Sequence, residues 1–327
     1  MIEAAVTIEH WPMKDVFATS RDAIAEIPVL LLVLTDRSGR RGRAEAAGVD
    51  YEGETPQSMA SDIASIAGKL HDAITRDEVE RLLPPGGARN ALDCALWDLE
   101  AKRSGVPAWR SAGLAALAPV TTCLTIGLGD EATTRRKARA AGGYELLKLK
   151  LDAERHIDVV RIVREEQPGA RLLVDANQAW SRPLLERLLP RLAELGVELI
   201  EQPVPRREDA TLDGLVSALP LAADESCVDR GSLPGLLGRY RYLNIKLDKC
   251  GGLTEALALA AEATRLGFEL MVGNMCGTSL AMAPAFLIAQ SCRYVDLDGP
   301  LLQRDDRAPA IVYRRGLMSV PAAALWG

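Results

Sequence analysis

After about residue 121, the sequence alternates regularly between short apolar runs and longer helical stretches. The apolar runs predict strands at 122–127, 146–150, 171–175, 198–201, 221–224, 242–247, 269–273 and 294–298. Strands separated by helices are typical of a parallel sheet, because a parallel neighbour needs a long crossover connection. Eight such units are the number that closes a (β/α)8 barrel, with a doubly wound sheet as the alternative.

The N-terminal third has a different pattern. It predicts strands at 4–9, 27–35 and 42–47, followed by helices at 58–70, 76–83 and 88–103. The cluster of two prolines and two glycines at 84–87 breaks the chain and suits the start of the last helix. Residues 310–321 contain one further predicted strand, which would return to the N-terminal region.

Composition restricts the chemistry. The formal charge of -6 argues against a nucleic-acid partner, because phosphate binding needs a basic surface. Only 3 histidines occur, which excludes a His-rich zinc site and leaves proton transfer to Lys, Asp or Glu. The 6 cysteines form no C-x-x-C pair, and no apolar run approaches membrane-spanning length. The N-terminus does not resemble a signal peptide, so we expect a cytoplasmic protein without a membrane partner.

Acidic residues end three consecutive predicted strands. Asp175, Glu201 and Asp224 each follow an apolar run directly. Neighbouring strands of a sheet lie about 4.8 Å apart, so these carboxylates can converge on one ion at the barrel rim. Three oxygen ligands without His or Cys favour Mg²⁺, with Mn²⁺ also possible.

Lysines occupy the strands on either side of this trio. Lys148 and Lys150 share one face of the preceding strand, and Lys246 lies in the strand that follows. A single charged residue after a strand is usually a solvated loop residue or a helix cap. A series of lysines and acids on five successive strands is harder to explain by structure alone, so Lys150 and Lys246 are predicted to flank the ion.

Two further motifs carry weaker signals. Asp296 and Asp298 share one face of the last predicted strand, but D-x-D is a short pattern. The segment Cys250-Gly251-Gly252-Leu253 lacks the Gly-Lys-Ser/Thr of a phosphate loop and predicts a tight turn before a helix.

At these residues the sequence resembles the enolase superfamily, and within it the dipeptide epimerases of the L-Ala-D/L-Glu epimerase type. The matching segments span nearly the whole chain and lie at 88–98, 147–152, 174–177, 201–203, 223–226, 244–253 and 296–300. The resemblance implies an α/β fold: a (β/α)8-type barrel with an N-terminal α+β capping domain that the C-terminal tail completes. The expected bounds are 1–116 for the cap, 117–303 for the barrel and 304–327 for the C-terminal segment.

The resemblance also implies a reaction, the Mg²⁺-dependent epimerisation of a dipeptide at the α-carbon of its C-terminal residue. The expected pair is L-Ala-L-Glu and L-Ala-D-Glu, in murein peptide metabolism. The metal on the carboxylate trio would stabilise an enediolate. Lys150 and Lys246 would move the proton on opposite faces of the carbon, and Lys148 would polarise the site or contact the substrate carboxylate.

For substrate binding, the resemblance implies that Asp296 and Asp298 pair with the ammonium group of the dipeptide. Arg21 would pair with the Glu side chain, or else be an ordinary solvated charge. Further candidates line the pocket, namely Thr122, Thr125, Asn274 and Met275.

Two alternatives stay open at the level of sequence. A muconate cycloisomerase or o-succinylbenzoate synthase-like reaction would use the same scaffold, but its substrates lack an ammonium group. A non-catalytic barrel that binds a metal or ligand would not need two flanking lysines. The predicted partner is a small dipeptide, with a second copy of the chain in a homo-oligomer as a further candidate.

Overall fold

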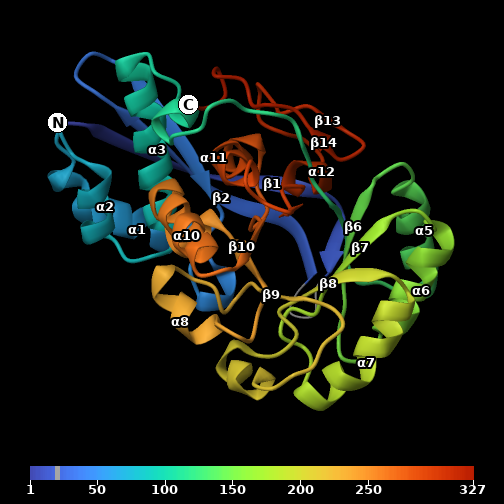
Figure 1. Ribbon diagram of the computed structural model, residues 1–327. Coiled ribbons are helices and arrows are strands. Elements are labelled where there is room, and N and C mark those ends of the chain that lie inside the picture. Colours follow the sequence, from blue (N-terminus) through green and yellow to red (C-terminus); the bar gives the residue numbers. More distant parts are fainter. Residues whose placement is uncertain (19–22) are drawn as a thin grey trace.

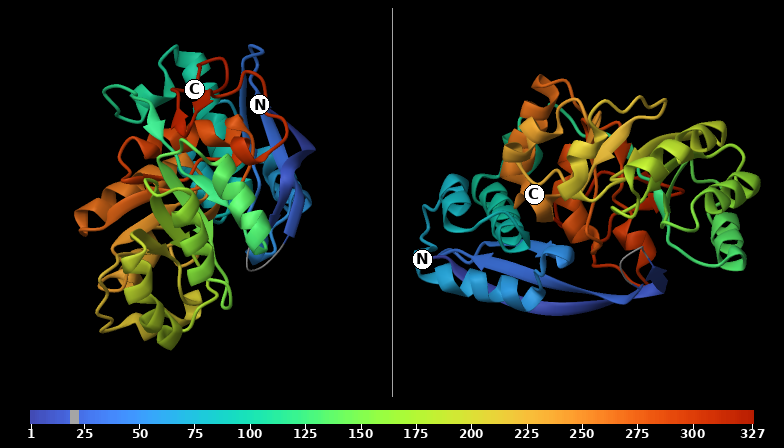
Figure 2. Two further views of the ribbon diagram at one scale, coloured as in Figure 1. Left: turned by 90° about the vertical axis from the view of Figure 1, so that its right-hand side faces the viewer. Right: turned by 90° about the horizontal axis from the view of Figure 1, so that it is seen from below.

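The computed structural model describes residues 1–18 and 23–327, which form a cap and a barrel (Figure 1). The cap sheet is antiparallel and contains β1 (Glu3–Ala18), β2 (Ala23–Thr35) and β3 (Arg41–Ala46). Alternate side chains of β2, Leu30, Leu32 and Leu34, are buried, as the period of a strand requires. Seen from below, the blue strands run along one side of the molecule (Figure 2).

Helices follow this sheet in the cap. The cap contains η1 (Asp50–Glu52), α1 (Pro56–Ile66), η2 (Ala67–Lys69), α2 (Arg76–Leu82), α3 (Gly87–Ser104) and α4 (Ala108–Ser111). Thr55 and Thr75 form capping boxes that fix the starts of α1 and α2. Most of α3 is buried on every side, because it contacts the cap strands and also the barrel helices α9 (Leu247–Cys250) and α10 (Leu253–Arg265).

The barrel is an eight-stranded parallel sheet whose spatial order follows the chain. Its strands are β5 (Leu124–Ile126), β6 (Leu146–Lys150), β7 (Arg171–Asp175), β8 (Val197–Glu201), β9 (Leu221–Ala223), β10 (Tyr242–Ile245), β11 (Glu269–Val272) and β12 (Tyr294–Val295). The first and last strands meet through a hydrogen bond from the Cys123 N–H to the Val295 carbonyl, at 2.9 Å. The predicted α/β barrel with its N-terminal cap is therefore confirmed.

The strands are connected mainly by helices. These are α5 (Glu131–Ala140), α6 (Ile157–Glu166), α7 (Arg182–Glu194), η3 (Arg206–Leu212), η4 (Arg230–Ser232), α8 (Leu233–Leu236), α9 (Leu247–Cys250), α10 (Leu253–Arg265) and α11 (Ser279–Ala289). No helix within the described residues is both long and apolar enough to span a bilayer.

Eight buried side chains form an apolar layer inside the barrel. Seven lie in strands β6 to β12, and the eighth directly precedes β5. The eight are Cys123, Leu146, Leu173, Leu199, Ala222, Tyr242, Met271 and Tyr294. Because strand side chains alternate, the residue two positions later points to the same interior, one layer nearer the carboxyl rim. Polar residues occupy that layer in seven of the eight strands: Thr125, Lys148, Asp175, Glu201, Asp224, Asn244 and Asp296. Gly273 occupies it in the other strand.

The C-terminal segment differs from the single predicted strand. After α12 (Gly299–Leu302), β13 (Tyr313–Arg314) and β14 (Leu317–Met318) form a short hairpin that pairs with β4 (Val120–Thr121), not with the cap sheet. The chain then returns to the cap, where the Trp326 indole N–H donates to the Cys94 carbonyl at 3.0 Å. The domain bounds 1–116, 117–303 and 304–327 stay a prediction.

Candidate active site

Three buried carboxylates meet at the carboxyl rim of the barrel. Asp175 ends β7, Glu201 ends β8, and Asp224 follows β9 directly. One oxygen from each lies within 4.8 Å of the others. All three are hard oxygen donors that burial shields from competing water, so the residues fit a divalent ion such as Mg²⁺.

The ammonium group of Lys148 lies among these acids. It is 2.8 Å from Glu201, 3.1 Å from Asp175 and 2.7 Å from Asp296. Burial lowers the pKa of Lys148, but the negative charges of Asp296, Glu201 and Asp175 outweigh it and hold that pKa well above its usual value. These carboxylates therefore favour the cationic form of Lys148, which balances part of the negative charge of the site.

Lys150 and Lys246 each contact a different member of the trio. The Lys150 ammonium lies 2.6 Å from Asp175 Oδ2, and the Lys246 ammonium lies 2.8 Å from Asp224 Oδ2. Burial lowers the pKa of Lys246, but the Asp224 carboxylate outweighs this effect and raises it overall. The two lysines come from β6 and β10, which are four strands apart and so stand on opposing walls of an eight-stranded barrel.

Both lysines line one cavity of about 270 Å³ between the barrel rim and the cap. The walls from the cap include Ile24, Ile27 and Pro28 of β2. The loop segment between β3 and α1 adds Ala47, Gly48, Asp50, Glu54, Thr55 and, at the start of α1, Pro56. Glu54 fixes that loop, because its carboxylate accepts from the backbone N–H groups of Val49 (2.9 Å) and Gly87 (2.8 Å). The cap thus forms the outer wall of the cavity.

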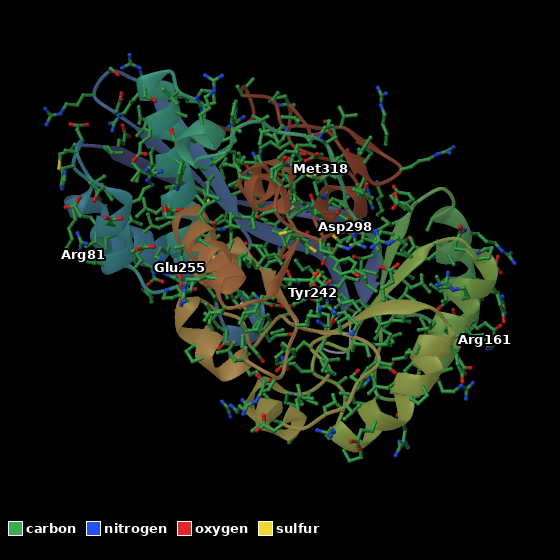
Figure 3. The ribbon with its side chains drawn as sticks, in the orientation of Figure 1. Arg81, Arg161, Tyr242, Glu255, Asp298 and Met318 are labelled. Atoms are coloured by element: carbon green, nitrogen blue, oxygen red, sulfur yellow. The ribbon has the colours of Figure 1, made fainter. Side chains whose placement is uncertain are left out.

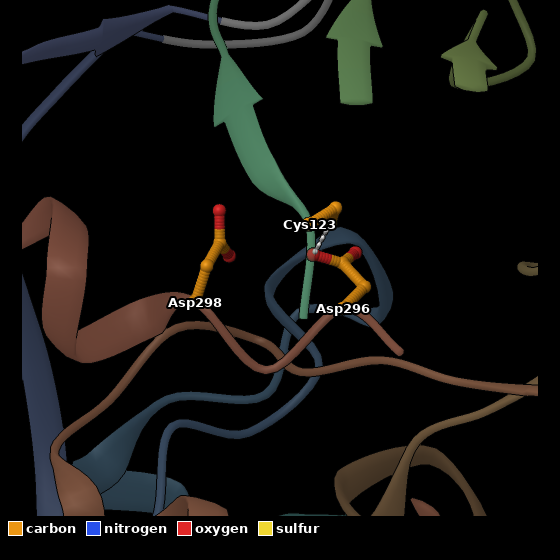
Figure 4. A group of neighbouring side chains, drawn as sticks. All are labelled: Cys123, Asp296 and Asp298. Atoms are coloured by element: carbon orange, nitrogen blue, oxygen red, sulfur yellow. Dashed lines mark hydrogen bonds between the residues drawn. The ribbon is translucent and has the colours of Figure 1, made fainter. Parts of the chain in front are cut away.

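Asp296 and Asp298 follow the last strand and point in different directions (Figure 4). Asp296 Oδ1 accepts from the Cys123 thiol at 3.1 Å, whereas Asp298 Oδ2 accepts from the Thr125 N–H at 2.6 Å. Burial and the neighbouring charge of Asp296 raise the pKa of Asp298 to about 7. Figure 3 shows Asp298 well inside the molecular outline, consistent with an exposed fraction of 2%.

The Cys123 thiol lies close to both aspartates, and ligand atoms of the three residues are within 4.8 Å of one another. Burial and the charges of Asp296 and Asp298 raise the pKa of Cys123 well above its usual value. The thiol therefore keeps its proton and donates to Asp296. Cys123, Asp296 and Asp298 thus form one buried cluster in the barrel interior, beside the last strand.

The remaining candidate residues are placed as follows. Thr122 is buried, and its hydroxyl accepts from the Leu297 N–H at 2.8 Å. Asn274 donates to the Asp296 carbonyl at 2.5 Å and accepts from the Cys276 N–H at 2.7 Å. Met275 lines the cavity beside both lysines. Arg21 lies outside the described residues.

Sequence reasoning missed several polar residues that support this site. The Lys249 ammonium contacts Asp224 Oδ1 at 2.6 Å and also bonds the Asp224 carbonyl. Asn244 donates to Glu201 Oε1 at 2.8 Å. Asn244 could have been predicted, because it lies two residues before Lys246 and so shares its face of the strand. Lys249 could not be predicted in this way, because it lies in α9, where side chains do not alternate as in a strand.

Comparison with known protein families accounts for both parts of the chain. Residues 130–324 match the family model described as enolase C-terminal domain-like. Residues 1–113 match the mandelate racemase / muconate lactonizing enzyme N-terminal domain. The chain belongs to the enolase superfamily.

Within the enolase superfamily, the chain is similar to epimerases over almost its full length. It is 39% identical to the L-Ala-D/L-Glu epimerase of Escherichia coli K12 over 310 residues, covering 94% of this chain and 96% of that protein. An enolase family member from Agrobacterium tumefaciens with homology to dipeptide epimerases has bound sodium and L-Ala-L-Glu in its crystal structure. It superposes with a TM-score of 0.97 at 41% identity, covering 100% of both chains.

A third enolase superfamily member is less similar in sequence. The dipeptide epimerase of Methylococcus capsulatus, complexed with Mg and L-Arg-D-Lys, superposes with a TM-score of 0.90 at 32% identity. The match covers 98% of this chain and 96% of that one.

Proposed function

We propose that this protein is a dipeptide epimerase that inverts the α-carbon of the C-terminal residue, converting L-Ala-L-Glu and L-Ala-D-Glu into each other. One observation carries the proposal. Lys150 and Lys246 reach one cavity from opposing walls, and each contacts a different carboxylate of the trio. A carbon held between them can lose a proton on one face and gain one on the other, which inverts it.

Asp175, Glu201 and Asp224 would hold Mg²⁺, with Mn²⁺ as a possible substitute. Bound there, the ion would reduce the negative charge around the lysines and stabilise the charge that develops on the substrate carboxylate as the α-proton leaves. Lys148 adds a fixed positive charge on the same side. Water is kept from the reacting carbon by the cap loop, which Glu54 holds across the cavity.

The rest of the cavity would bind the two ends of the dipeptide. The amino end extends toward Asp296 and Asp298, near Thr125 and the buried Thr122. The C-terminal side chain lies toward the cap, where Asn274 and Met275 form part of the wall and Arg21 would meet a γ-carboxylate. Known structures with bound dipeptides, L-Ala-L-Glu and L-Arg-D-Lys, support this substrate class.

Incubation with dipeptides in D₂O tests the function directly. With Mg²⁺ present, L-Ala-L-Glu is expected to take up one deuterium at the C-terminal α-carbon and to yield L-Ala-D-Glu, read by mass spectrometry and chiral chromatography. The absence of exchange across a panel of dipeptides would contradict the proposal. A cycloisomerase or o-succinylbenzoate synthase-like activity is not favoured by relatives that are epimerases, and a purely binding barrel would not need both lysines.

We further propose a cytoplasmic location and a role in the turnover of murein peptides. All six cysteines are free thiols, as suits a reducing compartment. Light scattering would establish whether the chain forms a homo-oligomer.

A further inference from the structure

Gln202, the residue after β8, replaces one backbone hydrogen bond of the barrel with its side chain. Its N–H still follows the parallel pattern of β8 and β9 and donates to the Ala222 carbonyl at 2.8 Å. The next bond of that pattern would run from the Asp224 N–H to the Gln202 carbonyl. Gln202 has a positive φ of 32°, however, and its carbonyl accepts from the Gln178 N–H. The Asp224 N–H donates instead to Gln202 Oε1, at 2.9 Å.

The surroundings of the buried Gln202 side chain allow only one orientation of its amide. Oε1 accepts from the backbone N–H groups of Asp224 and, at 3.2 Å, Ser226, which an amide nitrogen cannot do. The NH₂ group lies 2.9 Å from the Ser226 hydroxyl, 3.0 Å from the Val204 carbonyl and 3.0 Å from the Tyr240 hydroxyl. A flipped amide would place this NH₂ group against two backbone donors.

Tyr240 and Asp209 hold the NH₂ end of the amide. The Tyr240 hydroxyl donates to Asp209 Oδ1 at 2.6 Å, so its oxygen faces Gln202 as an acceptor. Burial and the Asp209 carboxylate raise the pKa of Tyr240, so this hydroxyl keeps its proton. Asp209 Oδ1 also lies 3.4 Å from the NH₂ group itself. Polar contacts therefore connect Asp209 to the Asp224 backbone through two intervening side chains.

The position of the Asp224 backbone matters because its carboxylate has several neighbours. Oδ1 lies 2.6 Å from the Lys249 ammonium, and Oδ2 lies 2.8 Å from the Lys246 ammonium. The same carboxylate must stay close to those of Asp175 and Glu201 to complete the trio. An aspartate side chain is short, so a shift of its backbone moves the carboxylate directly.

We infer that Gln202 is a positioning residue for the metal site, which sets the affinity of the trio for Mg²⁺ by fixing the Asp224 backbone. Tyr240 and Asp209 act through Gln202, because they determine which end of its amide faces Asp224. This inference rests on the Mg²⁺ site of the proposed function, and it requires no particular substrate.

Mg²⁺ titrations without substrate test the inference. Gln202→Leu keeps the size of the side chain and removes its polar atoms. Calorimetry on the folded variant should show a Kd for Mg²⁺ about tenfold to a hundredfold higher than that of the wild type. The control is Gln178→Leu, since the half-buried Gln178 follows the neighbouring strand and its Oε1 accepts from the Arg206 N–H at 3.0 Å. Its Kd should change less than about threefold.

Mn²⁺ in place of Mg²⁺ reports the geometry of the ligands. At saturating Mn²⁺, the electron paramagnetic resonance line shape of Gln202→Leu should differ from that of the wild type, whereas Gln178→Leu should keep it. A Gln202→Leu variant with a lower Tm but with the Kd and the line shape of the wild type would show a role in folding alone. That result would overturn the inference, as would an equal loss of affinity in Gln178→Leu.

Tyr240→Phe removes a single hydroxyl and decides the question if Gln202→Leu does not fold. Its Kd for Mg²⁺ should rise by about threefold to tenfold. In the Gln202→Leu background, the same change should add no more than about twofold, because its effect passes through Gln202. The control is Tyr242→Phe, because the Tyr242 hydroxyl donates to Glu269, at 2.5 Å, outside the trio. A Kd of the wild type in Tyr240→Phe would overturn the inference.

The outcomes distinguish this inference from the proposed function. A wild type that does not bind Mg²⁺ would overturn the inference. If Mg²⁺ binds and only the variants of Gln202 and Tyr240 weaken it, but no dipeptide exchanges its α-proton, the proposed function fails and the positioning role stands.

Discussion

At the scale of single residues, Lys150 and Lys246 determine which epimer of the substrate can exchange its α-proton. If each serves one face of the α-carbon, Lys150→Met and Lys246→Met should each lose epimerisation by at least about a hundredfold. Each should still exchange the α-proton of one epimer, L-Ala-L-Glu or L-Ala-D-Glu, and the two variants should keep opposite ones. Deuterium uptake by mass spectrometry checks this. Exchange of both epimers by either variant would contradict a two-base arrangement.

Glu201 allows a test of the metal site that does not depend on activity. Mg²⁺ at about a hundred times its dissociation constant should stabilise the wild type by about 2.7 kcal/mol, which is a rise in Tm of about 5 °C. Glu201→Gln should reduce that rise to below about 1 °C in differential scanning fluorimetry. The control is Glu198→Gln on the same strand, because Glu198 pairs with Arg171 outside the trio. Equal shifts in both variants would exclude Glu201 as a ligand.

The sequence predicted which polar side chains face the barrel interior wherever side chains alternate along a strand. A period of two turns Lys148, Asp175 and Glu201 toward the barrel interior, and the Lys148 ammonium lies 3.1 Å from Asp175 and 2.8 Å from Glu201 in the structure. The same period could not reveal that Asp296 is already bound to Lys148, because that contact joins strands 148 residues apart. Partners of this kind depend on barrel closure, which no local pattern encodes.

At the scale of elements, the cap helix α3 and the loop after α9 are fitted closely to each other. Arg89 donates to the Cys250 carbonyl at 2.5 Å, and Asp93 accepts from the Thr254 hydroxyl at 2.5 Å. The predicted tight turn at 250–253 is confirmed by positive φ angles of 80° at Gly251 and 117° at Gly252. The loop is thus a docking site for α3.

Gly252→Ala is expected to destabilise this contact. An added Cβ would lie 2.5 Å from Asp93 Oδ2, at a φ angle that side chains rarely adopt. Overpacking and backbone strain together should lower the free energy of unfolding by about 2–4 kcal/mol. Gly235→Ala in α8 is the control, because a Cβ there meets nothing within 4 Å. Urea denaturation that shows equal stability for both variants would contradict this packing argument.

Asp248 in α9 gives the interface between cap and barrel a pH dependence. Its Oδ1 accepts from the Gly48 N–H at 2.9 Å, and burial raises the pKa of Asp248 from 3.8 to about 7. The raised pKa means that folding favours the protonated form. The contribution of Asp248 to the free energy of unfolding is therefore fully present below about pH 4 and is lost as the pH rises through about 7.

The difference between Asp248→Asn and the wild type isolates this effect. The amide keeps the acceptor but cannot ionise, so the variant should gain stability relative to the wild type between pH 4 and 8. The expected gain is on the order of a few kcal/mol, measured by urea denaturation at each pH. A difference that stays constant over this range would mean that Asp248 does not titrate in the folded protein.

At the scale of the whole molecule, the cavity is formed by segments that are far apart in sequence. The cap loop at 47–56 and the loop at 274–276 meet over the lysines, and the tail links cap and barrel. The sequence could predict the main strands and helices of the cap and the number of barrel strands, because these follow from local periodicity, but it did not predict the C-terminal hairpin of β13 and β14. It could not predict which loop covers the rim, because that depends on tertiary packing.

Glu45 shows how strongly these parts are joined, and it provides the last prediction. Its buried carboxylate on β3 accepts from Thr278 of the barrel, at 2.6 Å, and pairs with Arg307 of the tail, at 2.8 Å. Arg307 also pairs with Glu9, so it keeps one carboxylate partner when Glu45 is changed. Glu45→Gln replaces one buried acceptor oxygen by an NH₂ group, which leaves a donor unpaired and should cost about 1–3 kcal/mol. The exposed Glu52–Arg206 pair is the control, and Glu52→Gln should cost less than about 1 kcal/mol. Because Glu45 binds cap, barrel and tail together, fluorescence and circular dichroism should report one shared unfolding transition at lower urea. A separate early transition of the cap would show that the two parts unfold independently.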